Sequence, residues 1–281
     1  MGDLGQPRLA AVIITRNESL DIAACIESCS FAEKVFVLDS LSTDDTAARA
    51  RAAGADVQFR EFTNYADQQN VALSLVADFD WVLMMDADER VPKDMASEVR
   101  AVVCDASDDI VLYRIRRKDF FFGRWLRCAT GYPTWSARLM RPVRVHFTRD
   151  INEELVAHGK TAFLSTHFHH FPFSKGISAW FERHNSYSTM EAIRLGEEQS
   201  SRIGWRLSDL GDPARRRRVA KQVFYRLPCR PLIAFLGLYL LRGGFLDGWA
   251  GLQYCRPRSM YEYMIALKMH ERRFLAAARR T

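Results

Sequence analysis

Residues 81–90 of the chain read Trp-Val-Leu-Met-Met-Asp-Ala-Asp-Glu-Arg, a short apolar run that stops at two carboxylates, Asp86 and Asp88. Apolar runs of this length, bounded by polar residues, are typical of buried strands. Open α/β sheets bind ligands at the carboxyl ends of such strands. An Asp-x-Asp pair there can bind Mg²⁺ or Mn²⁺ through oxygen, while water and substrate phosphates supply the remaining ligands. The alternative for so short a motif is a solvated acidic turn, and the flanking segments decide between the two.

The segments before this strand predict a parallel sheet. Residues 9–14 and 35–39 read as buried strands, and residues 57–59 read as a short third strand. Helices are expected up to Cys29, from the capping candidates at 42–45 to Gly54, and over residues 64–76. Strands that alternate with helices at this spacing favour parallel pairing with right-handed crossovers.

Polar residues follow three of the predicted strands. Thr15, Asn17 and Glu18 follow the first strand, Asp39 ends the second, and the Asp-x-Asp pair ends the fourth. In a parallel sheet these ends point the same way, so the side chains are expected to converge on one ligand. Neither glycine-rich phosphate loop, G-x-G-x-x-G or G-x-x-x-x-G-K-[ST], follows the first strand. A nucleotide bound here would therefore need a metal to neutralise its diphosphate.

The composition is that of a globular protein. The chain has 281 residues, of which 48% are hydrophobic and 26% charged, enough for one large domain or a domain with an appendage. We expect a domain over residues 1–175 and a helical region over residues 176–281. No signal peptide is predicted, and the six cysteines lack paired metal spacing, so a reduced, cytoplasmic setting is expected.

The C-terminal region is basic. Residues 201–281 contain 17 Lys and Arg against 5 Asp and Glu, and the first 200 residues contain 23 against 29. The apolar run 231–241 lies between Arg230 and Arg242 and is too short to span a bilayer, which needs about 20 residues. We expect it to associate with the surface of an anionic membrane. An oligomer interface or a re-entrant hairpin with residues 245–252 is the alternative.

Motifs along nearly the whole chain resemble glycosyltransferase family 2, and within it the WaaE-type lipopolysaccharide inner-core β-glucosyltransferases. The first half has Ile-Thr-Arg-Asn-Glu at 14–18, an Asp-Ser-x-Ser-Thr-Asp-x-Thr stretch at 39–46, Gln-Gln-Asn at 68–70 and Asp-Ala-Asp-Glu at 86–89. The second half has matching stretches at 123–125, 138–141, 152–155, 185–189 and 245–248. The resemblance implies a GT-A fold, which is Rossmann-like, with a mostly parallel sheet flanked by helices and a membrane-associating helical extension.

The resemblance also implies roles for individual residues. It places Thr15, Asn17, Glu18, Asp39, Gln68, Asn70 and Asp86 at a nucleotide-sugar donor, and Asp86, Asp88 and His170 at a divalent metal, Mg²⁺ or Mn²⁺. Acceptor contacts are expected from Trp125, Arg127 and Arg138, through ring stacking and phosphate binding. Glu153 matches the position that we interpret as the general base, with Glu154 as its competitor. The subgroup has a histidine where this chain has Asn152.

The implied reaction is an inverting transfer of a hexose, with glucose as the first choice, from a UDP-sugar to a lipid-linked saccharide such as lipopolysaccharide inner core. Such a single displacement needs a base for the acceptor proton, worth about 10²–10⁴-fold in rate, and charge stabilisation on the leaving diphosphate. The protein would act at the cytoplasmic face of the inner membrane, without nucleic acid, and a second copy of the chain is a candidate partner.

Two other functions compete with this one. A non-catalytic adaptor could bind nucleic acid or membrane through Arg215–Arg218, but this leaves the carboxylates at the strand ends without a purpose and lacks an RNA-binding signature. Nucleotidyl transfer would require a glycine-rich loop that the first strand end lacks. The histidines at 167, 169 and 170 could suggest zinc, but alternation along a strand places the first two on one face and His170 on the other.

Overall fold

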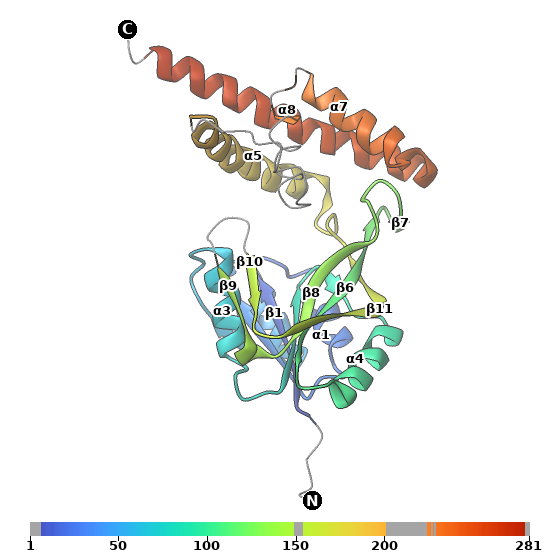
Figure 1. The fold of residues 1–281 in the computed structure, drawn as a ribbon. Helices are drawn as coiled ribbons and strands as arrows, with labels where there is room; N and C mark the ends of the chain where they lie inside the picture. The colour runs from blue at the N-terminus through green and yellow to red at the C-terminus, as the bar shows by residue number, and fades with distance from the viewer. Residues whose placement is uncertain (1–6, 149–153, 201–223, 226, 228, 279–281) are drawn as a thin grey trace, which may run out of the picture. The chain divides into compact units, whose positions relative to one another are not determined.

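The computed structural model describes residues 7–148, 154–200, 224, 225, 227 and 229–278 (Figure 1). The chain divides into two compact units. One comprises Met1–Phe120 and Tyr132–Ser174, and the other comprises Phe121–Gly131 and Lys175–Thr281. The second unit thus combines a short segment from the middle of the chain with the C-terminal helices.

Across the described residues, nine strands form one mixed sheet in the order β3-β2-β1-β4-β8-β6-β11-β5, with β7 paired to β6. The first four strands in this order are parallel, and β8 is antiparallel to both β4 and β6. A separate antiparallel pair is formed by β9 and β10. The strands are β1 (Leu9–Thr15), β2 (Lys34–Asp39), β3 (Asp56–Phe59), β4 (Trp81–Asp86), β5 (Glu89–Arg90), β6 (Ile110–Phe121), β7 (Arg124–Leu126), β8 (Thr134–Met140), β9 (Val145–Thr148), β10 (Glu154–Ala157) and β11 (Lys160–His170).

Helices cover both faces of this sheet because successive residues of its central strands point to opposite sides. Ala11 and Ile13 of β1 pack in one apolar cluster with α1 (Ile22–Ser28) and α4 (Lys93–Asp105). Ala10 and Val12 pack in the other cluster with α3 (Tyr65–Ser74). Helix α2 (Thr46–Ala52) connects β2 to β3. The mostly parallel α/β architecture expected from the sequence is confirmed.

Local signals account for several element boundaries. Asn64 begins α3 because its side-chain oxygen accepts the Asp67 N–H at 2.8 Å, a capping bond that replaces a missing intrahelical partner. Gly54 follows α2 at a φ of +89°, a left-handed conformation that glycine adopts without a Cβ clash. Both positions agree with the sequence-based expectation.

The second unit is helical. It contains α5 (Gly176–Ser200), α7 (Arg230–Leu236) followed by a π-helical turn (Gly237–Leu241), and a 3₁₀ turn (Gly244–Asp247) that leads into α8 (Gly248–Ala278). Gly243 has a φ of +73° and makes the predicted turn between two helical segments. The expected apolar helix over residues 231–241 is present as α7 and the π-helical turn.

A lysine connects α8 to α5. The ammonium of Lys268 lies 2.5–2.8 Å from four oxygens of α5, which belong to Asn185 (backbone and side chain), Ser188 and Thr189. These contacts explain the polar stretch 185–189 as a packing feature of the helical unit. Of these residues only Ser188 is buried, and Lys268 supplies the hydrogen-bond partner that a buried hydroxyl normally has.

One carboxylate holds the hairpin segment 121–131 to the helices. Asp247 accepts the backbone N–H groups of Arg127, Cys128 and Ala129 at 2.7–3.2 Å. Charge-assisted hydrogen bonds from backbone N–H groups are among the stronger ones in proteins. Next to it, Phe122 contacts Trp249 with ring centroids 5.5 Å apart. The motif at residues 245–248, noted in the sequence, therefore contains the carboxylate that binds this hairpin.

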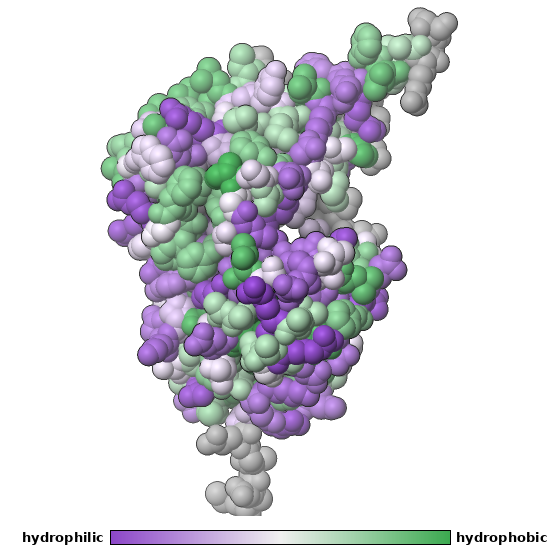
Figure 2. Space-filling view, turned by 180° about the vertical axis from the view of Figure 1, so that it is seen from behind, coloured by the Kyte–Doolittle hydropathy of each residue, from purple (hydrophilic) through white to green (hydrophobic). Residues whose placement is uncertain are grey.

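Apolar side chains lie exposed on the helical unit, and Figure 2 shows apolar surface over the C-terminal helices. In the described part of the chain, no single helix has the length and apolar character needed to cross a membrane. One bent pair, residues 230–241 and 244–278 with a 70° bend, meets the criteria of length and composition together.

A close backbone approach at the start of α8 gives a test of the helical unit. A Cβ at Gly251 would lie 2.0 Å from the Gly244 carbonyl oxygen, whereas one at Gly196 in α5 would meet nothing within 4 Å. We expect Gly251→Ala to lower the free energy of unfolding by about 1–3 kcal/mol. Gly196→Ala, the matched control, should raise it by up to about 1 kcal/mol. Urea unfolding of both variants checks this, and equal effects would contradict the described approach.

Candidate functional site

Three parallel strands end side by side at one edge of the sheet. Thr15 pairs in register with Asp39 on β2, and Ile14 pairs in register with Asp86 on β4. The expectation that the strand ends converge is confirmed. Ligands of open α/β sheets bind at this edge.

Buried acceptor atoms gather at the ends of β1 and β2. Asp39 is fully buried and accepts the Ser42 N–H at 2.6 Å through one oxygen, while Gln68 donates to the Ser40 hydroxyl at 3.0 Å. Within the described residues, three buried atoms have no hydrogen-bond partner: the second carboxylate oxygen of Asp39, the side-chain oxygen of Gln68 and the Thr15 hydroxyl. Buried acceptors left without a donor in a protein usually meet one from a ligand or water. This corner therefore suits a ligand that presents N–H and O–H donors.

The loop after β2 is fixed by backbone and side-chain bonds from the loop after β1. The Asn17 side-chain oxygen accepts the Thr43 N–H at 2.8 Å, and its own N–H donates to the Ser42 hydroxyl at 2.8 Å. The Glu18 N–H donates to the Thr46 hydroxyl at 2.8 Å. The stretches at 14–18 and 39–46 thus form one structure around the end of β2.

Arg138 of β8 joins two carboxylates at the end of β4. Its guanidinium lies 2.6 Å from the Asp86 carboxylate and also bonds Glu89. Glu89 is 1% exposed, and its other oxygen accepts the Asp86 N–H at 3.0 Å. Arg90 reinforces this turn by donating to the Ala87 and Glu89 carbonyls at 2.8 Å. The turn that carries the Asp-x-Asp pair is therefore held by charged side chains on both sides.

The electrostatics of this cluster follow from its burial. Burial raises the pKa of Glu89 to about 7, although Arg138 acts to lower it. Burial acts to lower the pKa of Arg138, but the carboxylates of Asp86 and Glu89 outweigh this effect and raise it. Arg138 is therefore a permanent cation, and the proton content of Glu89 changes near neutral pH.

Asp88 faces His170, which is oriented by a second carboxylate. The His170 Nδ1 lies 2.6 Å from Asp119 of β6, and its Nε2 lies 3.5 Å from the Asp88 carboxylate. Burial acts to lower the pKa of His170, but the hydrogen bonds to Asp119 and Asp88 raise it to about 9. The imidazole is therefore protonated at neutral pH and bridges two carboxylates.

The donor set of Asp88 and His170 fits part of a divalent metal shell. Among the residues that the structure describes, no group of three or more His, Cys, Asp or Glu side chains could hold a metal ion. Two protein ligands nevertheless suffice where water and substrate phosphates complete the shell, as is common for Mg²⁺. A carboxylate on the far nitrogen of a histidine, here Asp119, is the usual support for a metal-binding imidazole. Metal binding at His170 would require loss of the proton on Nε2.

Asn70 and Arg138 have structural partners in this fold. The Asn70 amide donates to and accepts from the backbone of Phe147 at 2.8 Å, which joins α3 to β9. Arg138, expected at the acceptor, is instead bonded to Asp86 and Glu89. The roles predicted for both residues in substrate binding stay predictions.

The remaining predicted site residues lie elsewhere. Trp125 and Arg127 belong to the hairpin of the helical unit, so their acceptor role stays a prediction. Glu153, Asn152 and the run Arg215–Arg218 lie outside the described residues. The side chain of the alternative base, Glu154, also lies outside the description.

The sequence analysis gave no role to Glu89 and Asp119. In the structure Glu89 binds Arg138, and Asp119 binds His170. Glu89 follows the Asp-x-Asp pair directly, and its 1% exposure distinguishes it from a surface glutamate. Asp119 is the single acid in the long strand β6 and lies between Lys118 and Phe120. Asp119 is 4% exposed in the fold, and a buried acid needs a charged partner, but its place after three basic residues gave no sign of this burial. The predicted arrangement of the histidines is confirmed, because His167 and His169 stack with centroids 5.5 Å apart.

The sequence profile of Glycosyl transferase family 2 matches residues 10–169, more than half of the chain. The chain belongs to glycosyltransferase family 2. This match includes the strand ends and the Asp-x-Asp turn, and it ends one residue before His170. It confirms the resemblance and the enzyme class, and it favours an enzyme over a non-catalytic adaptor.

Two family relatives align over most of this glycosyltransferase. The lipopolysaccharide core biosynthesis glycosyltransferase LpsC of Rhizobium meliloti is 28% identical over 96% of this chain and 94% of that one. An uncharacterized glycosyltransferase of Rickettsia conorii is 29% identical over 72% of this chain and 75% of that one.

A solved structure shares part of the sequence. Glucosyl-3-phosphoglycerate synthase of Mycobacterium tuberculosis, in complex with Mn²⁺, UDP and glucosyl-3-phosphoglycerate, is 27% identical over 42% of this chain, with a TM-score of 0.34. The alignment spans 45% of that chain, less than half of its length.

The buried charges at the β4 end give a stability test. Arg138→Met removes the cation and leaves the Glu89 carboxylate buried beside Asp86. We expect the free energy of unfolding at pH 8 to fall by about 3 kcal/mol or more. The double variant Arg138→Met with Glu89→Gln should recover most of this loss, because no buried anion remains. Urea unfolding measures both; a single variant as stable as the parent would show that Arg138 does not neutralise Glu89.

The Asp119–His170 pair predicts a pH dependence in the metal-free protein. The folded pKa of about 9 lies above the unfolded value of about 6.5. The stabilisation from protonated His170 is therefore complete below about pH 6.5 and lost as the pH rises through about 9. In Asp119→Asn the pKa of His170 should fall by about 1–3 pH units, which NMR titration of the ring measures.

The same variant should weaken the dependence of stability on pH. Between about pH 7.5 and 9.5 the parent should lose free energy of unfolding, and Asp119→Asn should lose less. This interval lies above the titration of Glu89, so the two groups can be separated. Asp108→Asn, at a fully exposed acid, is the control and should behave as the parent. An unchanged slope in Asp119→Asn would contradict the pairing.

Proposed function

We propose that this glycosyltransferase transfers a hexose, with glucose as the first choice, from a UDP-sugar to a lipid-linked saccharide, with inversion of the anomeric centre. The proposal rests on one observation: unpaired buried acceptors and a carboxylate–histidine pair lie at the same edge of the sheet. Buried acceptors without partners lie at Asp39, Gln68 and Thr15, and the Asp88–His170 pair lies at the end of the neighbouring strand. A nucleoside and a diphosphate need these two kinds of site next to each other.

For the nucleoside, the proposal assigns the acceptors of Asp39 and Gln68 to donors of the uracil and the ribose. Both side chains are held in place, by the Ser42 N–H and the Ser40 hydroxyl. Preorganised acceptors of this kind discriminate well against ligands that leave them unpaired. Asn17 and Glu18 would contribute through the loop that they hold.

For the diphosphate, Asp88 and His170 would hold Mg²⁺ or Mn²⁺, with Asp86 beside them. When bound, such a cation stabilises negative charge on the phosphate of the leaving UDP. The residues of this chain prepare that site in two ways. Asp119 fixes the imidazole of His170, and Arg138 holds the turn through Asp86 and Glu89.

For the acceptor, the proposal keeps Glu153 as the general base, with Glu154 as the alternative. The base would take the proton of the acceptor hydroxyl while its oxygen forms the new bond at the anomeric carbon and UDP leaves. Trp125 and Arg127 would contact the acceptor sugar and its phosphates. The name of the LpsC relative supports lipopolysaccharide core as the acceptor class.

We further propose that the protein acts at the cytoplasmic surface of the inner membrane. Supporting this are the exposed apolar side chains around the turn between the two C-terminal helices, at Leu240, Leu241, Phe245, Leu246 and Trp249. Arginines such as Arg242 are exposed beside them. Apolar side chains with basic neighbours are typical of helices that lie in an anionic interface. A homo-oligomer that covers the same face is the alternative.

The donor half of the proposal is tested by binding. Binding of a panel of sugar nucleotides is measured by calorimetry in the presence of Mn²⁺ or Mg²⁺. We expect one UDP-hexose to bind, and Asp88→Asn to abolish this metal-dependent binding. Asp108→Asn, an exposed acid on the same unit, should bind as the parent does. Asp119→Asn should weaken metal affinity by about 10–100-fold. Donor binding that is equal with and without metal, or retained in Asp88→Asn, would overturn the assignment.

A further inference from the structure

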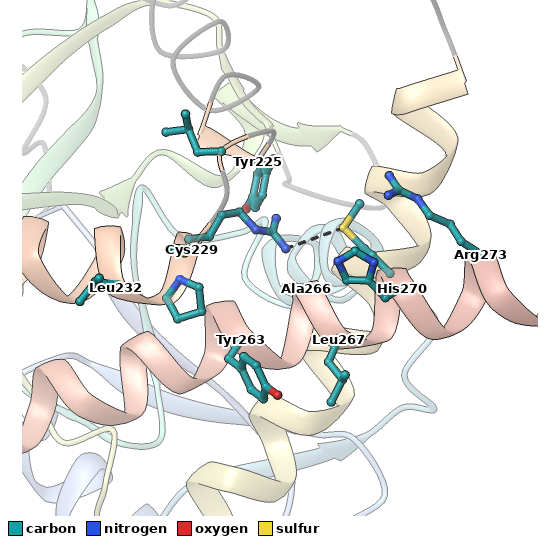
Figure 3. Close-up of a pocket in the computed structure, with 12 residues that line it drawn as sticks. Tyr225, Cys229, Leu232, Tyr263, Ala266, Leu267, His270 and Arg273 are labelled. Carbon is teal, nitrogen blue, oxygen red and sulfur yellow. Dashed lines mark hydrogen bonds between the residues drawn. The ribbon is translucent and has the colours of Figure 1, made fainter.

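A cavity of about 980 Å³ lies within the helical unit, between α7, the residues just before it, and one stripe of α8 (Figure 3). Its α8 residues recur every three to four positions, so they share one face of that helix. The volume is in the range of small-molecule binding sites. Its lining comprises Tyr225, Leu227, Cys229, Arg230, Pro231, Leu232, Tyr263, Ala266, Leu267, Met269, His270 and Arg273.

A buried cation without an anionic partner contributes to this lining. Arg230 is 5% exposed, and its Nη1 has no hydrogen-bond partner among the residues that the structure describes. Its Nη2 lies 4.0 Å from the thioether of Met269, a weak acceptor, and Figure 3 marks this contact. The guanidinium carbon also lies 5.3 Å from the Tyr225 ring centre. A buried charge is costly unless it is paired and hydrogen-bonded, so Arg230 is suited to a ligand anion.

The rest of the lining separates into basic and apolar parts. His270 and Arg273 follow one another along α8 on the same stripe (Figure 3). Leu232, Tyr263 and Leu267 are apolar walls that are more than half exposed. No Asp or Glu occurs among the described residues that line the cavity. The cavity thus offers an arginine for an anionic group and an open apolar surface for a hydrocarbon chain.

We propose that this cavity binds a membrane lipid with a phosphate headgroup, with the phosphate on the guanidinium of Arg230 and an acyl chain along Leu232, Tyr263 and Leu267. Arginine recognises phosphate with paired N–H donors. A free phosphate would satisfy the cation but leave the apolar walls in water, so the amphiphile fits both parts. The inference deepens the membrane association in the proposed function and rests on it, but it concerns a site distinct from the donor residues.

The direct test is binding of a short-chain phosphatidic acid, kept below its micelle concentration, to the full chain. Arg230→Met should weaken this binding by about tenfold or more, since one charge-assisted contact is lost. Because the guanidinium has no anionic partner in the described part of the chain, the variant should unfold at the same urea concentration as the parent or at a higher one. Arg272→Met, an exposed arginine of α8 that does not line the cavity, is the matched control and should bind lipid normally.

A second pair of variants tests the apolar wall without touching the buried arginine. Leu267→Glu adds a negative charge at the exposed wall and should also weaken lipid binding by about tenfold. Met260→Glu makes the same change at an exposed α8 position outside the cavity and should have little effect. If Arg230→Met fails to fold, this pair decides: equal binding in both variants overturns the proposal.

Other results overturn it as clearly. Inorganic phosphate that binds as tightly as the lipid, and competes with it, would identify a simple anion site. Lipid binding unchanged in Arg230→Met would remove the guanidinium from the site. UDP-sugar binding should persist in Arg230→Met, and lipid binding should persist in Asp88→Asn, so a failure of this inference is distinguishable from a failure of the donor assignment.

Discussion

The bridge that Arg138 makes between Asp86 and Glu89 is the constraint on which the site depends. A carboxylate as deeply buried as Glu89 is tolerated only with a partner, and Arg138 supplies that partner from an antiparallel strand. The same bridge fixes the turn after β4, because Glu89 also accepts the Asp86 N–H. Antiparallel β8, which lies beside the parallel half of the sheet, therefore supplies the side chain that holds the Asp-x-Asp turn in place.

A second chain of contacts extends from this turn. Asp88 faces His170, and His170 is held by Asp119, so three strand ends or turns contribute one charged group each. In the free protein, the positive charge of the protonated imidazole offsets part of the negative charge of the two carboxylates. A ligand that carries positive charge into this cluster would replace the proton on His170, which links binding at the site to pH.

Much of the first unit was predictable from the sequence. The alternation of apolar strands with capped helices located β1 to β4 and their parallel order, because periodicity and capping are local signals. Convergence at the sheet edge followed from topology alone. The partners of Asn70 and Arg138 were not predictable, since Asn70 pairs with the backbone of Phe147 and Arg138 with Asp86 and Glu89, and both contacts join segments that are distant in the sequence. Glu89 and Asp119 were missed for the same reason: burial, which decides their roles, is a tertiary property.

The contact of Asp247 with three backbone N–H groups of the hairpin also bears on how this enzyme can be recombined. Residues 121–131 are distant in sequence from the C-terminal helices but are fixed to them by one carboxylate. A chimera that exchanges only the region after residue 175 would pair a foreign helix turn with the native hairpin. Exchange of the intact helical unit between relatives would then require three junctions, before residue 121, after residue 131 and near residue 175, so that the hairpin and its carboxylate are inherited together.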